Sequence, residues 1–385
     1  MTAPTAESQK PAAAPLAEEA FSFRAFFWRW LDIIGPALAL LAIFIFFMFT
    51  VPEWQASDFH NARDFCAQLD RFANFDNISN ILRQSSMTAV ASLGMTFIII
   101  AGGIDLSAGS LAALSGVIVA VMLDKTAGSG TYLAAHPVAW PVVAAAVGVL
   151  VGVLSGLLNG LLVTGLEIVP FIITLGTMMI LRGLAKGFGN ETEVHTDTNW
   201  LYALLAPPDA SIHWMLFSPA IWITVLLAIM MAIILNYTRF GRHVIAVGSS
   251  EHTARLCGIP VTRTKLLVYT LGGLFSGIAG LFFYSRIRLG SPTAADGFEL
   301  DVIAAVVIGG ASLNGGKGSI FGSLVGALIL TVIANGCSQI HIPQFAQHFV
   351  GSETGLRTYI QQIVTGVIII LAVLVDRLRQ RGQAS

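Results

Sequence analysis

The sequence predicts an all-α polytopic membrane protein with about ten transmembrane helices, some of them short or broken. Of its 385 residues, 55% are hydrophobic and only 11% are charged, and the mean hydropathy is +0.76. A soluble domain carries about 25% charged residues, so this composition belongs in a bilayer. The net charge of −1 also argues against nucleic acid as a partner and leaves membrane lipid as the expected surroundings.

Apolar runs of about 20 residues, the length that crosses a bilayer core as a helix, recur along the chain. They cover residues 28–50, 84–102, 107–123, 138–164, 169–186, 216–236, 265–285, 301–313, 318–336 and 358–376. Because the eighth run is short, we expect it and the ninth to form a kinked or re-entrant pair joined by 314–318. Such irregular backbone is tolerated at membrane depth only inside protein or beside a cavity. Eight or nine full crossings are the alternatives to ten.

Positive charge orients these helices, because Lys and Arg are enriched in cytoplasmic loops. Arginines precede the first run and follow the last, and five basic residues lie in the loop 237–265. With ten crossings, all three regions and both termini fall on the cytoplasmic side. The loop 187–214 has four acidic residues and no Lys or Arg, as suits the outside. We therefore divide the chain into a disordered cytoplasmic tail (1–23), a membrane domain (24–378) and a cytoplasmic C-terminal tail (379–385).

Asp105 is the only charged residue between Arg83 and Asp124. A carboxylate at membrane depth is costly, and it usually marks a helix end, a pathway or a polar cavity. It follows the glycine pair 102–103 and precedes Ser107 at a predicted helix start, where a side-chain oxygen can accept from an exposed backbone N–H. A helix start inside the membrane also aims backbone donors into a cavity. A capping role and a direct role with a substrate are therefore both open.

One glycine motif occurs twice. Gly-Gly-x-x-Leu-x-x-Gly lies at 102–109 and again at 309–316. Transporters often contain internal repeats whose broken helices meet at the functional site. In a chain with 38 glycines, chance is the alternative explanation.

Small residues also recur at every fourth position, which gives a helix a smooth face for close packing. The three columns are Gly148, Gly152, Gly156 and Gly160; Gly272, Ser276 and Gly280; and Gly318, Gly322 and Gly326. We expect tight helix packing within one subunit, with a sliding surface or a dimer contact as the alternative.

The loop 237–265 contains the signals of a short helix. Ser249 or Ser250 can cap its start, Gly258 can end it, and Pro260 prevents its continuation. A short helix that projects from a membrane bundle is either a simple connector or a segment that docks into the groove of a partner.

No motif indicates catalysis, a metal site or a bound cofactor. The three cysteines form no C-x-x-C pair, and no H-E-x-x-H occurs. The stretch around Lys317 resembles a phosphate-binding loop only superficially, because Ala311 occupies the first required glycine and Gly318 replaces the Ser or Thr. We therefore expect no enzyme activity in this chain.

Several segments together resemble the permease subunit of bacterial monosaccharide ABC importers of the ribose, xylose, arabinose and galactose type. The resemblance runs from about residue 74 to residue 376. Its most specific segments are 80–86, 93–97, 102–110, 159–160, 170–178, 181–183, 241–243, 254–259 and 299–310. It implies a permease bundle in the bacterial inner membrane that forms a homodimer around a central pathway. It also implies two cytoplasmic ATPase subunits that use ATP, and a periplasmic sugar-binding protein.

Two groups of candidate site residues follow. The candidate pathway residues are Asp105, Ser107, Ser110, Asn159, Phe171 and Thr174. In the family that the chain resembles, the cytoplasmic loop before the seventh span meets the ATPase, which implies coupling roles for Glu251, Ala254, Arg255, Leu256, Gly258 and Ile259.

The chain departs from the family pattern at Ala108, at Glu167 and in the long outer segments 51–76 and 337–357, which leaves the sugar open. A related permease for branched-chain amino acids or another small solute is the nearest alternative. An ion-coupled transporter should carry several intramembrane carboxylates or paired charges, and Asp105 stands alone.

Overall fold

A computed structural model describes residues 23–51, 69–124, 135–207, 216–339 and 361–367, together with residues 370 and 374. Within these residues the fold is all-α apart from one two-stranded ribbon, which confirms the predicted fold class. Residues 1–22 of the predicted tail, most of the run 358–376, the tail 379–385 and most of the two long outer segments lie outside the described residues.

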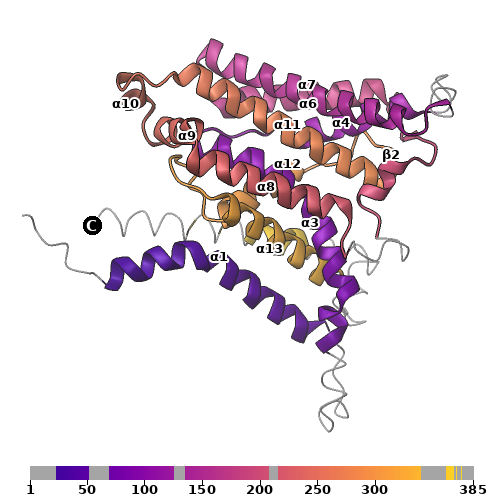
Figure 1. The fold of residues 1–385 in the computed structure, drawn as a ribbon, viewed down its shortest axis with the longest axis horizontal. Coiled ribbons are helices and arrows are strands. Elements are labelled where there is room, and N and C mark those ends of the chain that lie inside the picture. The colour runs from indigo at the N-terminus through magenta and orange to yellow at the C-terminus, as the bar shows by residue number, and fades with distance from the viewer. Residues whose placement is uncertain are drawn as a thin grey trace, which may run out of the picture.

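The helices follow the predicted apolar runs, except in the predicted loop 237–265, which contains a helix that was not predicted, α9 (Arg239–Ser249), before the predicted short helix α10 (Glu251–Leu256). In chain order they are α1 (Phe23–Thr50), α3 (Phe75–Ile100), α4 (Ala108–Leu123), α6 (Ala139–Leu166), α7 (Pro170–Phe188), α8 (Pro219–Tyr237), α9 (Arg239–Ser249), α10 (Glu251–Leu256), α11 (Val261–Ile287), α12 (Phe298–Ile308) and α13 (Ile320–Gln339). By length and composition α6, α7, α8, α11 and α13 can cross a membrane, while Gly35–Thr50 of α1 and all of α4 are shorter apolar helices. The bundle thus combines full-length helices with short ones (Figure 1).

The central helix of the bundle is α11, which packs against α6, α3 and α4. A Cβ on Gly152 of α6 would lie 2.8 Å from the Cα of Gly277, and a Cβ on Gly156 would lie 2.8 Å from the Cα of Gly273. The two backbones therefore touch with no side chain between them. Other members of the three columns also contact residues of this chain: Gly148 with Val119, Gly160 with Leu266, Gly272 with Ile98, Gly280 with Ala112, Gly318 with Ile100, Gly322 with Gly309 and Gly326 with Ala305. These small-residue faces are occupied within one subunit.

Helix α12 is separated from α13 by a stretch of irregular backbone. Its 11 residues make it about 16 Å long, too short to cross a bilayer core. The chain then runs through 309–319 without regular structure before α13 begins, and α12 packs against α13. The predicted eighth run is therefore a short helix joined to the ninth by irregular backbone.

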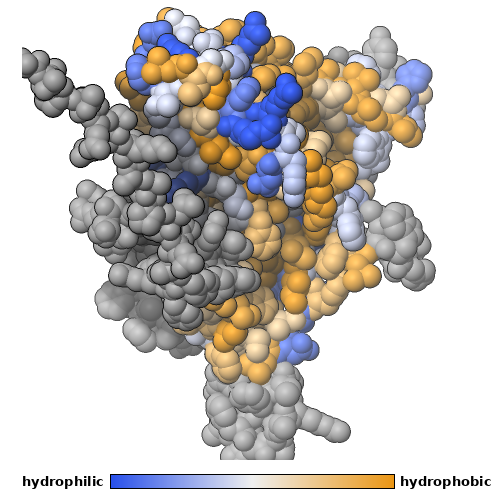
Figure 2. All heavy atoms as spheres, turned by 60° about the vertical axis from the view of Figure 1, so that its left-hand side comes forward, coloured by the Kyte–Doolittle hydropathy of each residue, from blue (hydrophilic) through white to orange (hydrophobic). Residues whose placement is uncertain are grey.

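The two ends of the bundle differ in character. At one end, α9 and α10 carry the exposed residues Arg239, Arg242 and Arg255, and Figure 2 shows hydrophilic residues gathered there beside apolar surface. At the other end, strand β1 (Val194–His195) pairs antiparallel with β2 (Leu289–Gly290), and the 3-10 helix η2 (Trp200–Leu204) lies nearby (Figure 1). Asn199, the N-cap of η2, donates through Nδ2 to the hydroxyl of Tyr284 on α11 at 2.9 Å.

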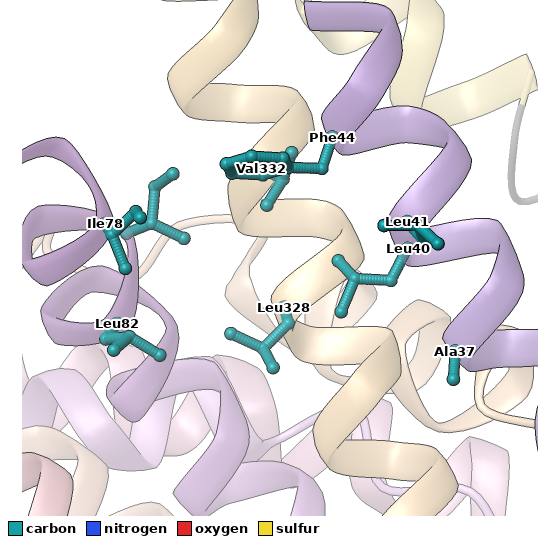
Figure 3. A pocket seen from close by; sticks show the side chains of 9 residues that line it. Ala37, Leu40, Leu41, Phe44, Ile78, Leu82, Leu328 and Val332 are labelled. Carbon is teal, nitrogen blue, oxygen red and sulfur yellow. The ribbon is translucent and has the colours of Figure 1, made fainter. Parts of the chain in front are cut away.

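Helix α1 lies at the edge of the bundle and packs on α13 (Figure 1). Between α1, α3 and α13 is a cavity of about 430 Å³ (Figure 3). Its lining is entirely hydrocarbon, contributed by Ala37, Leu40, Leu41, Phe44, Ile78, Ile81, Leu82, Leu328 and Val332. The polar groups that distinguish this protein lie elsewhere, at the breaks between helices.

Candidate functional site

The chain breaks sharply between α3 and α4. Gly102 has a φ of +81°, which favours glycine. Its N–H donates to the carbonyl of Ile99 at 2.9 Å, and the N–H of Gly103 donates to Ile98 at 2.9 Å. This pair of bonds is a Schellman motif, which ends α3 and satisfies two of its last carbonyls. The predicted glycine turn before Asp105 is therefore present.

Asp105 lies in the break and is 1% exposed. Its Oδ1 accepts from the N–H of Ser107 at 2.8 Å and from the hydroxyl of Ser107 at 2.6 Å. Ser107 is the N-cap of α4, so Asp105 binds the cap residue itself and not an amide inside the first turn. The N-cap position of α4 is therefore two residues after Asp105, which was the predicted capping residue. In the described part of the chain no Lys, Arg or His forms an ion pair with Asp105.

Side chains from three further helices reach this break. Asn159 of α6 donates through Nδ2 to the Ser107 hydroxyl at 2.8 Å, and Thr174 of α7 donates to the carbonyl of Ile104 at 3.3 Å. Tyr269 of α11 lies beside Gly103, where a Cβ would be 2.5 Å from the Tyr269 hydroxyl. The break is therefore enclosed by α4, α6, α7 and α11.

Several buried polar atoms around the break have no hydrogen-bond partner among the residues that the structure describes. They are Asn159 Oδ1, Ser110 Oγ and the Tyr269 hydroxyl, on side chains that are all at most 2% exposed. A buried polar group without a hydrogen bond costs about 1–3 kcal/mol of stability. A bound molecule that hydrogen-bonds to these atoms would remove this cost. The arrangement can bind water or the hydroxyl groups of a substrate.

The predicted pathway residues are only partly brought together. Asp105, Ser107, Asn159 and Thr174 are linked by the contacts above, and Ser110 lies on the first turn of α4. Phe171 is 47% exposed on α7 and lies outside this buried group. Tyr269 was not predicted, and the only signal for it was that it is one of two tyrosines in the apolar run 265–285.

The second copy of the glycine motif also ends a helix at a left-handed glycine, but one residue later in the motif than the first copy does. Gly310 has a φ of +93°, and the N–H groups of Gly310 and Ala311 donate to Val307 and Val306 at 2.9 and 3.1 Å. The N–H of Asn314 then donates to Ser312 Oγ at 3.3 Å. In the motif, Ser312 and Asn314 correspond to Asp105 and Ser107.

The two breaks also meet. The N–H of Gly316 donates to the carbonyl of Ile100 at 2.8 Å. The two helix breaks that carry the repeated motif thus contact each other.

Arg182 on α7 holds the segment that leads into α12. Its guanidinium donates to the carbonyls of Pro292 and Ala294 at 3.0 and 2.8 Å and pairs with Asp296 at 2.8 Å. The start of α12 is therefore fixed to the same helix that carries Thr174. This role of Arg182 was not predicted, because its partners are backbone carbonyls about 110 residues away.

Helix α10 is the short helix predicted in the loop 237–265. Ser250 is its N-cap and accepts from the N–H of Thr253 at 3.3 Å. Gly258 ends it with a φ of +78°, and the N–H of Ile259 donates to Ala254 at 3.0 Å. Both predicted end signals are confirmed.

Four of the six candidate coupling residues separate into two groups. The side chain of Arg255 is 64% exposed, and Leu256 is 76% exposed. Ala254 is 3% exposed and packs with Ile259 against Val247 and Val261, so these residues hold α10 to the bundle. Sequence reasoning did not separate the displayed residues from the anchoring ones.

Glu251 ties α10 to its neighbours. Its Oε2 accepts from Lys265 of α11 at 2.6 Å, and its Oε1 accepts from Arg255 at 2.9 Å. The hydrogen bond from Lys265, followed by the charge of Lys265 and the contact with Arg255, lowers the pKa of Glu251 below its usual value.

In the described part of the chain no group of His, Cys, Asp and Glu could hold a metal ion.

Residues 77–373 match the family described as branched-chain amino acid transport system / permease component. The chain belongs to this permease family. The matched residues include both helix breaks and the α9–α10 pair.

Curated relatives resemble the permease over most of its length. The ribose import permease protein RbsC of Bacillus subtilis (strain 168) is 40% identical over 305 residues, which cover 78% of this chain and 84% of RbsC. RbsC of Escherichia coli (strain K12) is 36% identical over 315 residues, covering 80% of this chain and 88% of the relative. The L-arabinose transport system permease protein AraH of the same strain is 36% identical over 312 residues, covering 81% and 86%. No solved structure matches the permease significantly.

Proposed function

We propose that this permease forms the translocation pathway for a monosaccharide in a bacterial ABC importer. The observation that carries the proposal is the 36–40% identity, over about 80% of the chain, to permeases named for ribose and L-arabinose. The importer would contain a second copy of this chain, two cytoplasmic ATPase subunits and a periplasmic sugar-binding protein. It would sit in the inner membrane with both termini cytoplasmic. ATP would be used by the partner subunits, and this chain would bind no cofactor.

The Asp105 break is the proposed polar contact along the pathway. A sugar with several hydroxyl groups requires hydrogen-bonding groups at membrane depth. The hydroxyl, amide and carboxylate groups here come from Asp105, Ser107, Ser110, Asn159 and Thr174. Asn159 and Ser110 have buried polar atoms without a partner in the described part of the chain, which supports a site completed by a bound substrate. Tyr269 would add a hydroxyl from α11.

Helix α10 is the proposed contact with the ATPase. It displays Arg255 and Leu256 while Ala254 anchors it, which suits a short helix that enters a partner's groove. The arginines around it give this end the positive charge expected on the cytoplasmic side.

A branched-chain amino acid is the second candidate substrate, because the family description names that class.

The test is ATP hydrolysis by the reconstituted complex of this permease, its ATPase and its binding protein. We expect stimulation when the binding protein is loaded with ribose or arabinose and none with leucine. If only the leucine-loaded binding protein stimulates ATP hydrolysis, the substrate is an amino acid and not a sugar.

A further inference from the structure

The last turn of α9 lies directly against both helix breaks, backbone against backbone. A Cβ on Gly248 would overlap the carbonyl oxygen of Ile100 and lie 2.7 Å from the nitrogen of Gly316. A Cβ on Gly315 would lie 2.7 Å from the oxygen of Gly248 and 3.1 Å from the Cα of Gly102. We call Gly102, Gly248, Gly315 and Gly316 the glycine junction.

Conformation as well as space requires glycine at this junction. Gly102, Gly315 and Gly316 have φ angles of +81°, +84° and +75°, in the left-handed region. The hydrogen bond from the N–H of Gly316 uses the carbonyl of Ile100, the last residue of α3, and final carbonyls of a helix have no partner within it. The junction thus joins the end of α3 to the segment before α13.

Helix α9 leads into α10 and packs against it through Val247 and Ala254. Only Ser250 separates the two helices, and it is the C-cap of one and the N-cap of the other. A displacement of α10 therefore moves the last turn of α9 with it. Close-packed interiors transmit a displacement rather than absorb it, and no flexible side chain separates Gly248 from the carbonyl of Ile100.

We propose that the glycine junction transmits movement of α10 to both helix breaks. The Asp105 segment and the segment 311–319 then shift together when the ATPase subunits close. This inference rests on the proposed function, in which α10 meets the ATPase. It goes further by naming the residues that connect that contact to the pathway.

The first test measures sugar imported per ATP hydrolysed by the reconstituted complex that carries Gly248→Ala. The added methyl group must push α9 away from Ile100, so we expect the complex to hydrolyse ATP while the ratio falls by about tenfold. Gly176→Ala is the matched control, because a Cβ there meets nothing within 4 Å. A ratio in Gly248→Ala equal to that of the control would overturn the inference.

A second test does not depend on the folding of any variant. Amide exchange is compared between the nucleotide-free and the vanadate-trapped wild-type complex. We expect exchange at 101–107 and 311–319 to change by about fivefold or more on trapping, together with exchange in α10. A change in α10 without a change at the breaks overturns the inference and leaves the proposed function intact. An unchanged α10 contradicts both.

Discussion

At the scale of single residues, the central feature is a buried carboxylate that receives hydrogen bonds. Asp105 accepts two bonds from Ser107 and has no ion-pair partner in the described part of the chain. A carboxylate used as a hydrogen-bond acceptor can be replaced by an amide, whereas a carboxylate that binds a proton or an ion cannot. We therefore expect Asp105 to act through its acceptor oxygen.

Two substitutions of Asp105 separate these roles. Asp105→Asn keeps an oxygen that can accept from the N–H of Ser107. We expect near-normal sugar uptake. Asp105→Ala leaves the Ser107 N–H unpaired at a cost of about 1–3 kcal/mol, and it should lower both stability and uptake. Complete loss of uptake by a fully assembled Asp105→Asn protein would instead show that the charge is required.

Glu251 provides a residue-scale prediction with a defined pH dependence. Because Lys265 lowers its pKa in the folded protein, the ion pair stabilises the docked α10 fully above the unfolded pKa of Glu, about 4.3. This contribution is lost as the pH falls through the lower, folded pKa. Amide protection of α10, corrected for intrinsic exchange, should therefore drop on acidification in the wild type. Glu251→Gln should start lower and lack this step, whereas Lys265→Gln, which leaves the pair with Arg255, should start lower and show a smaller step. A full step that persists in both variants would exclude the pair as its cause.

At the scale of helices, close packing depends on glycine between α6 and α11. A Cβ on Gly156 would overlap the carbonyl oxygen of Tyr269 and lie 2.8 Å from the Cα of Gly273. Alanine normally favours a helix over glycine by about 1 kcal/mol, while overpacking costs about 1–3 kcal/mol. We expect Gly156→Ala to lower the midpoint of thermal unfolding in detergent and Gly176→Ala to leave it equal or higher. Equal midpoints for both variants would mean that α6 and α11 are not packed this closely.

The coupling role of α10 has its own test. Arg255→Glu reverses a charge that is displayed on α10, so we expect uptake to fall by about tenfold or more while membrane insertion is unchanged. Arg263→Glu is the control, because Arg263 is exposed at the same end but lies outside α10. Equal uptake by the two variants would argue against α10 as the ATPase contact.

The helices were predictable because their signals are local. Apolar runs placed them, and Ser250 with Gly258 placed the ends of α10. Helix α9 was missed although its buried residues Val244 and Val247 recur at helical spacing. The other misses depend on tertiary packing. The hydroxyl of Tyr269 beside Gly103, the burial of Ala254 and the position of Gly248 against Ile100 follow from how helices pack, which no local pattern records.

At the scale of the whole molecule, the fold brings two copies of one broken-helix motif together. Their contact, between Ile100 and Gly316, lies against α9 and next to the helix that displays Arg255. A charged end, a polar break and a connection between them are the parts that an ATP-driven pathway subunit needs. The family match and the similarity to ribose and arabinose permeases point to the same function.

The most direct test is uptake of radiolabelled ribose and arabinose into proteoliposomes that contain this permease, its ATPase and its binding protein. We predict that sugar accumulates against its gradient only when ATP and the binding protein are both present, and that proton and sodium ionophores have no effect. Accumulation without ATP, or accumulation that ionophores abolish, would contradict an ATP-driven sugar importer.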